Sequence, residues 1–64
     1  MKVGDTVYTV NAKTNKVDTW KYAGKLLTKD EVLIQLITNN SQCFLPRRCV
    51  FEIYEDALAV ANNQ

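Results

Sequence analysis

The sequence contains no histidine, and it has only two glycines, two cysteines and one proline. Histidine is the commonest general base and metal ligand, so its absence excludes Ser-His-Asp and Cys-His catalysis. A structural zinc site needs about four ligands, and Cys43 and Cys49 would supply two. The two glycines, Gly4 and Gly24, are too far apart for a phosphate-binding loop or a dinucleotide fingerprint. We therefore expect no catalytic, metal-binding or cofactor-binding residues.

Long apolar runs are also missing. No stretch approaches the roughly 18 apolar residues of a membrane span, and no signal-peptide pattern is present. The formal net charge of +1 gives no long-range attraction to membranes or nucleic acids. Two cysteines are too few for a disulfide scaffold, so we expect a cytoplasmic protein with reduced thiols. Cys43 and Cys49 are interpreted as small buried apolar residues, with a redox pair activated by Arg47 and Arg48 as the alternative.

The length of 64 residues and the hydrophobic content of 47% predict one folded domain spanning residues 1–64. A chain of this size buries only about 60% of the surface that its unfolded form exposes. A deep catalytic cleft would have to be formed from that small core. We therefore expect a protein that is not an enzyme.

Most of the chain has the composition of β-strands. Segments rich in β-branched and aromatic residues occupy residues 3–10, 17–27, 32–37 and 42–45, with a short fifth segment at 50–51. Gly24 lies inside the second segment and predicts a bend or a bulge. Strict alternation along that segment predicts one face with Trp20, Tyr22 and Leu26, and an opposite face with Lys21 and Lys25.

The C-terminal part of the chain has the pattern of a helix over about residues 53–62. Apolar residues recur there at helical spacing, at Tyr54, Ala57, Leu58 and Ala61. The strand at 32–37 is apolar on both faces, so it needs two covers. We expect this helix to be the second cover, and we expect Leu58→Asp to unfold the protein.

Five short strands, a bent second strand and a C-terminal helix predict a small five-stranded SH3-like barrel. The opening Gly4-Asp5-Thr6-Val7-Tyr8, and Val50-Phe51 followed by Glu55-Asp56-Ala57, resemble small SH3-like barrel proteins of bacterial and phage genomes. In that family a threonine caps the last helix, and here Ile53 replaces it. The resemblance implies a phage or mobile-element accessory protein, and it brings no site residues because those proteins are mostly of unknown function.

We expect a protein-binding module with two polar contact surfaces, a loop near residues 11–16 and a basic turn. The candidate partner-binding residues are Asn11, Lys13, Asn15, Lys16, Arg47 and Arg48. The alternative is a nucleic-acid face, in which aromatic side chains stack bases beside lysines. Its candidate residues are Lys13, Lys16, Lys21, Lys25, Arg47 and Arg48. A third hypothesis is a homodimer, formed if residues 32–37 keep an uncovered apolar face.

Overall fold

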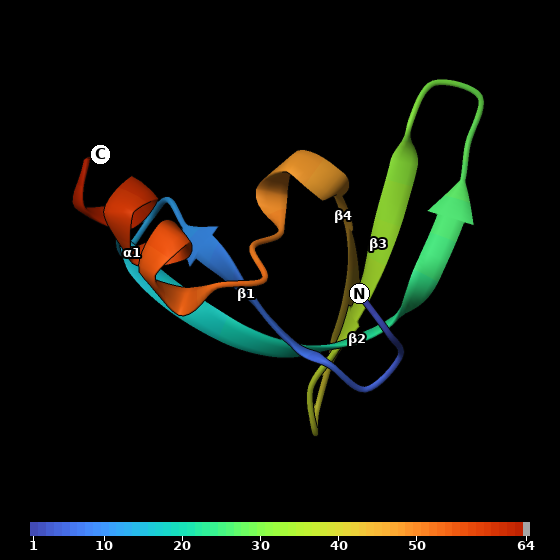
Figure 1. Cartoon of the computed structure of the whole chain (residues 1–64), viewed down its shortest axis with the longest axis horizontal. Helices are drawn as coiled ribbons and strands as arrows, with labels where there is room; N and C mark the ends of the chain where they lie inside the picture. Colours follow the sequence, from blue (N-terminus) through green and yellow to red (C-terminus); the bar gives the residue numbers. More distant parts are fainter. Residues whose placement is uncertain (64) are drawn as a thin grey trace.

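The computed structural model describes residues 1–63 of the chain. Four strands, β1 (Thr6–Asn11), β2 (Lys16–Leu27), β3 (Val32–Ile37) and β4 (Gln42–Pro46), form one antiparallel sheet in the order β1-β2-β3-β4. The 3-10 helix η1 (Arg47–Cys49) and the helix α1 (Tyr54–Asn62) follow. Figure 1 shows β2 as a long curved strand with β1 and α1 near one end and β3 near the other. The fold is therefore mainly β, as predicted.

The five-stranded closed barrel predicted from the sequence is not present. The sheet is open, and the fifth strand is reduced to a single bridge between Tyr8 and Phe51. At this bridge each backbone nitrogen lies 2.8 Å from the other residue's carbonyl oxygen. Because η1 ends at Cys49 and α1 begins at Tyr54, only four residues lie between the two helices. That segment is too short to pair along the length of β1.

The bend predicted at Gly24 is confirmed as an irregularity in the pairing of β2 with β3. Tyr22 and Gly24 pair with the consecutive residues Leu36 and Gln35, so β2 carries one extra residue at this point. Gly24 has φ 137°, a backbone conformation that suits glycine. From Gly24 onward, each residue of β2 therefore faces the side of the sheet opposite to the one that regular alternation predicts.

This reversal corrects the predicted faces of β2. Trp20 and Tyr22 do pack at the core, but Leu26 does not join them and is 50% exposed. Lys25 pairs instead with the buried Ile34, whereas Lys21 pairs with Ile37 on the other face. Directly paired residues of antiparallel strands project to the same side of a sheet. Lys21 and Lys25 therefore lie on opposite faces.

The core lies on one side of the sheet and is closed by the segment after η1. Its buried members are contributed by four strands or segments: Val7, Tyr22, Ile34, Leu36 and Val50. The partly buried side chains of Trp20, Cys43 and Leu45 pack against this cluster. The Trp20 Nε1 atom donates a hydrogen bond of 3.0 Å to Oγ1 of the buried Thr9, so its polar group is satisfied.

The helix α1 begins and ends close to the predicted positions, but it covers a different part of the sheet. It packs against β1 and β2, and its Tyr54 ring meets the Tyr8 ring edge-on with centroids 5.5 Å apart. The buried helix residues are Ala57 and Ala61, whereas Leu58 is 36% exposed. The prediction that α1 covers β3 is therefore wrong, and the exposure of Leu58 removes the reason to expect that Leu58→Asp unfolds the protein. Small alanines allow the helix to approach β1 and β2 closely.

Candidate functional site

The turn from β1 to β2 includes four of the predicted partner-binding residues: Asn11 ends β1, Lys13 and Asn15 lie in the loop, and Lys16 begins β2. The two asparagines shape this turn. The Asn11 Oδ1 atom accepts a hydrogen bond of 2.9 Å from the backbone nitrogen of Lys13, and the Asn11 carbonyl accepts one of 2.7 Å from that of Asn15. Asn15 has φ 56°, the left-handed conformation that asparagine tolerates. Lys13 and Lys16 are exposed. The asparagines therefore have a structural explanation, and the lysines are the accessible groups of the loop.

The two arginines of η1 are engaged with the protein itself. The Nη1 atom of Arg47 donates a hydrogen bond of 2.7 Å to the carbonyl oxygen of Val50, and its Nη2 atom lies 3.7 Å from Oε2 of Glu52. The Nη1 atom of Arg48 lies 3.4 Å from Oε2 of Glu31. Arg47 holds the segment that closes the core. Arg48, with a side chain that is 76% exposed, is the more accessible of the two.

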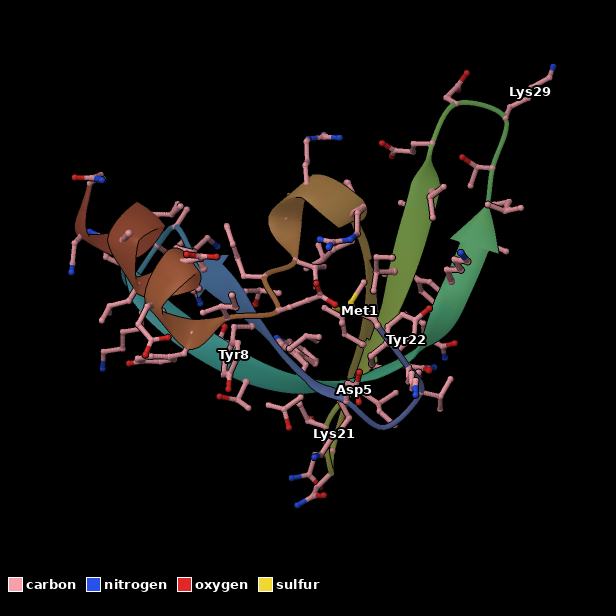
Figure 2. All side chains as sticks on the ribbon, in the orientation of Figure 1. Met1, Asp5, Tyr8, Lys21, Tyr22 and Lys29 are labelled. Atoms are coloured by element: carbon pink, nitrogen blue, oxygen red, sulfur yellow. The ribbon has the colours of Figure 1, made fainter. Side chains whose placement is uncertain are left out.

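The six basic residues of the predicted nucleic-acid face do not share one surface. Lys13 lies in the β1–β2 loop and Lys16 begins β2, while Lys21 donates from Nζ to Oγ1 of Thr6 at 3.0 Å. Figure 2 shows the side chains of Lys21 and Tyr22 pointing to opposite sides of β2. Lys25 and Arg47 line a common cavity on the core side. The structure therefore brings Lys25 and Arg47 to one cavity, but it does not gather all six residues on one face.

That cavity has a volume of about 390 Å³ and lies beside the core. Its lining residues are Met1, Tyr22, Lys25, Val32, Ile34, Arg47 and Glu52. Its apolar wall comes from the sheet, and its charged groups lie at the rim. The carboxylate of Glu52 is balanced by the Arg47 guanidinium and by the Met1 nitrogen, which lies 3.3 Å from Oε1. Lys25 is exposed beside this cavity, and it forms no ion pair with any of residues 1–63.

An exposed apolar surface lies on the opposite side of β2, β3 and β4, and we refer to it as the outer face. The strand register aligns Leu26 with Leu33, and Gln35 with Phe44. Leu26, Phe44 and Ile37 are 50%, 45% and 38% exposed, and Leu33 is half-buried. Surface leucines scattered singly need no explanation, but these residues lie on one side of three adjacent strands. Gln35 lies between Leu33 and Ile37, and Lys21 is paired with Ile37 on the same side.

The outer face was not among the predicted partner-binding residues, although the homodimer hypothesis depends on the apolar side of residues 32–37 that contributes to it. The apolar pattern on both sides of residues 32–37 was its signal in the sequence. That pattern was assigned to contact with α1, which packs elsewhere. The second apolar side of β3 therefore has no cover among residues 1–63.

The two cysteines are free and differ in their environment. Cys43 packs against the core, and desolvation by burial raises the pKa of its thiol. Cys49 is exposed at the end of η1, so the prediction that it is buried is wrong. A higher pKa lowers the fraction of nucleophilic thiolate at Cys43. This counts against an activated redox pair.

Within residues 1–63, no three His, Cys, Asp or Glu side chains gather as metal ligands would. None of the described helices is long and apolar enough to cross a membrane. Comparison of the chain with family models, with curated proteins and with solved structures finds no match. The outer face is thus the candidate site that the geometry supports best.

Proposed function

We propose that this protein is a non-enzymatic protein-binding module of the cytoplasm that docks its partner on the outer face. The observation that carries the proposal is the grouping of Leu26, Ile37 and Phe44 on one uncovered side of the sheet. Exposed large apolar side chains concentrated on one side of a small protein are typical of interaction surfaces. The aromatic Phe44 is the anchor of this surface, since aromatic residues are enriched at the centre of interfaces.

An SH3-like fold for this module is part of the proposal. Its support is the strand order β1-β2-β3-β4, the bulge in β2, and the bridge that returns Phe51 to the edge of β1. These features place the short fifth segment beside the first strand, as a small barrel of this kind requires. In this proposal the open sheet is a variant of the SH3-like architecture in which the closing strand is reduced to one residue pair.

The size of the outer face indicates what the partner must supply. Full burial of a large apolar side chain contributes about 1.5–3 kcal/mol, so burying the exposed halves of three such residues contributes roughly 3 kcal/mol. Association costs about 4 kcal/mol or more in lost translation and rotation. Apolar contact alone is therefore insufficient. Gln42 is exposed and Gln35 is half-buried on the same face, and we propose that they add hydrogen bonds to the partner.

Affinity capture with matched variants tests this proposal. Wild-type protein, Leu26→Lys and a double variant Lys13→Glu with Lys16→Glu are used as baits, and each captured protein is then purified and its affinity measured directly. We expect Leu26→Lys to weaken binding at least tenfold and the double loop variant to bind like the wild type. Retained binding by Leu26→Lys, together with loss in the loop variant, would move the site to the loop between β1 and β2.

Nucleic-acid binding is the second candidate function, and it rests only on Lys25 and Arg47 at the cavity and on the two loop lysines. Binding through phosphates weakens steeply as salt concentration rises. A gel shift at low salt that disappears at about 200 mM salt would favour it. The protein-binding proposal predicts no shift.

A further inference from the structure

The sheet has two edge strands, and only one of them is occupied. At the β1 edge, Tyr8 and Phe51 form two backbone hydrogen bonds with each other. Arg47 donates a hydrogen bond to the carbonyl oxygen of the adjacent Val50. At the β4 edge, no other segment of residues 1–63 pairs with the side of β4 that faces away from β3. Unpaired edge strands are templates for strand addition. The edge of β4 is therefore a docking position distinct from the outer face.

The register shows which backbone groups of β4 are available. The Thr38 nitrogen donates to the Ser41 oxygen at 2.8 Å, so these residues form a hydrogen-bonded pair at the end of the hairpin. Hydrogen-bonded and non-hydrogen-bonded pairs alternate along an antiparallel ladder. Cys43 and Leu45 therefore direct their N–H and C=O groups toward β3. Phe44, in the pair between them, directs its N–H and C=O groups to the open edge.

We propose that the edge of β4 pairs with the same strand of a second copy of this chain, in antiparallel register about Phe44. At the centre of that pairing, each Phe44 N–H donates to the carbonyl oxygen of Phe44 in the other copy. The two Phe44 side chains become direct cross-strand neighbours on the outer face. Aromatic pairs in this position stabilise strand pairing.

The chemistry of β4 selects this occupant. An added strand must be extended, must carry no charge opposite β4, and must offer an apolar residue beside Phe44. β4 consists of Gln-Cys-Phe-Leu-Pro, has no charged residue, and carries its phenylalanine at the middle position. Proteins commonly protect an open edge with a lysine or another charge. β4 has no such charge. In this register Pro46 of each copy lies opposite Gln42 of the other, so one backbone hydrogen bond is missing at each end of the pairing and the bonds about Phe44 remain.

The available area sets the strength of the association. A stable interface buries about 800 Å² on each partner, which is about a sixth of the 4662 Å² that this chain exposes. Five residues of strand are only about 17 Å long, so one edge covers much less than this. We therefore expect a reversible dimer, mostly dissociated at about 10 µM and substantially formed near 1 mM. In the dimer the outer faces of the two copies form one continuous surface, so each dimer presents two adjoining docking sites.

Sedimentation velocity between about 10 µM and 1 mM tests the association with two variants. Phe44→Lys places a charge at the centre of the pairing, and we expect it to remain monomeric throughout. Leu26→Lys is the matched control, since Leu26 is similarly exposed on the same face but lies two strands from the edge. We expect it to dimerise like the wild type. A wild type that stays monomeric at 1 mM overturns the proposal, and loss of the dimer in both variants shows face-to-face packing instead.

Amide hydrogen exchange tests the predicted backbone bonds. We expect the Phe44 amide to exchange rapidly in dilute protein and about two- to fivefold more slowly near 1 mM, because its exchange rate follows the monomer fraction. The Cys43 amide should be protected at both concentrations. A Phe44 amide with the same exchange rate at both concentrations overturns the proposal.

N-methylation of the Phe44 amide in a synthetic chain removes only the hydrogen-bond donor at the open edge, so this variant replaces Phe44→Lys if that protein fails to fold. We expect it to abolish the dimer. The proposed partner binding is measured on dilute monomer, so its failure is distinguishable from failure of the dimer.

Discussion

Replacement of Gly24 by alanine tests the bulge that decides which side chains of β2 face the core. Gly24 has φ 137°, where a residue with a Cβ atom is strained. A Cβ atom built at this position meets no heavy atom within 4 Å. The substitution therefore changes the backbone energy and creates no collision. Its effect on stability measures the conformational requirement of the bulge alone.

The magnitude follows from the strain at that backbone conformation. A residue held in a sparsely populated region costs about 1–3 kcal/mol. Domains have a free energy of unfolding of roughly 0.05–0.15 kcal/mol per residue, which gives about 3–10 kcal/mol for a chain of this length. Gly24→Ala thus removes a large fraction of the total stability. In a domain this small, each kcal/mol lowers Tm by about 4–8 °C.

D-alanine at the same position is the matched control, and a chain this short is accessible to chemical synthesis. Its preferred φ values are the mirror image of those of L-alanine, so φ 137° falls in its extended region. It also reduces the freedom of the unfolded chain, as L-alanine does. We expect the D-alanine protein to be more stable than the wild type by about 0.4–1 kcal/mol. Urea denaturation of the three proteins measures the difference. Equal destabilisation by both alanines would show that Gly24 does not adopt this conformation.

Three further predictions concern the helix, the thiols and η1. Ala57→Asp buries an unpaired carboxylate and should cost about 3–5 kcal/mol, whereas Leu58→Asp, at a position that is 36% exposed, should cost about 1 kcal/mol, as measured by chemical denaturation. In single-thiol variants, Cys43 should react with a disulfide reagent more slowly than Cys49. Because burial raises the pKa of Cys43, its reaction rate should rise only above the pH at which an ordinary thiol ionises. Equal rates for the two thiols would contradict this. Arg47→Ala removes the 2.7 Å hydrogen bond to a carbonyl oxygen, and since the arginine is 49% exposed we expect a loss of about 1 kcal/mol, seen as a lower Tm.

The strands and the helix could be predicted because their boundaries are encoded locally. The turn residues at 28–31 and 38–41 separate the apolar segments, and in each turn the threonine nitrogen bonds the carbonyl oxygen three residues later. The predicted helix differs from α1 by one residue at its start. Ile53 indeed makes no side-chain cap hydrogen bond. Polar turns and helical spacing act over a few residues, so a single sequence reveals them.

The faces of β2 and the position of α1 could not be predicted, for two different reasons. Gly24 indicates an irregularity, but the sequence does not show how many residues the irregularity inserts, and one extra residue exchanges Lys25 and Leu26 between the two faces. The position of α1 depends on which surface fits its buried alanines. The sequence pattern places Leu58, which has the larger side chain, in the apolar stripe of the helix, yet Leu58 is 36% exposed. Hydrophobic size did not decide the contact, because the helix packs closely through Ala57 and Ala61.

The uncovered outer face and the open β4 edge have a common origin in the length of β2. This strand has 12 residues, twice the length of β1 or β3, and its two halves serve different neighbours. The first half pairs with β1 and contacts α1, and the second half pairs with β3. Because residues 1–63 form one α-helix, which lies at the β1 end, the β3–β4 end keeps an apolar face and an unpaired edge. Binding at that end therefore leaves the contacts of α1 unchanged, and variants of the outer face can be examined in a folded protein.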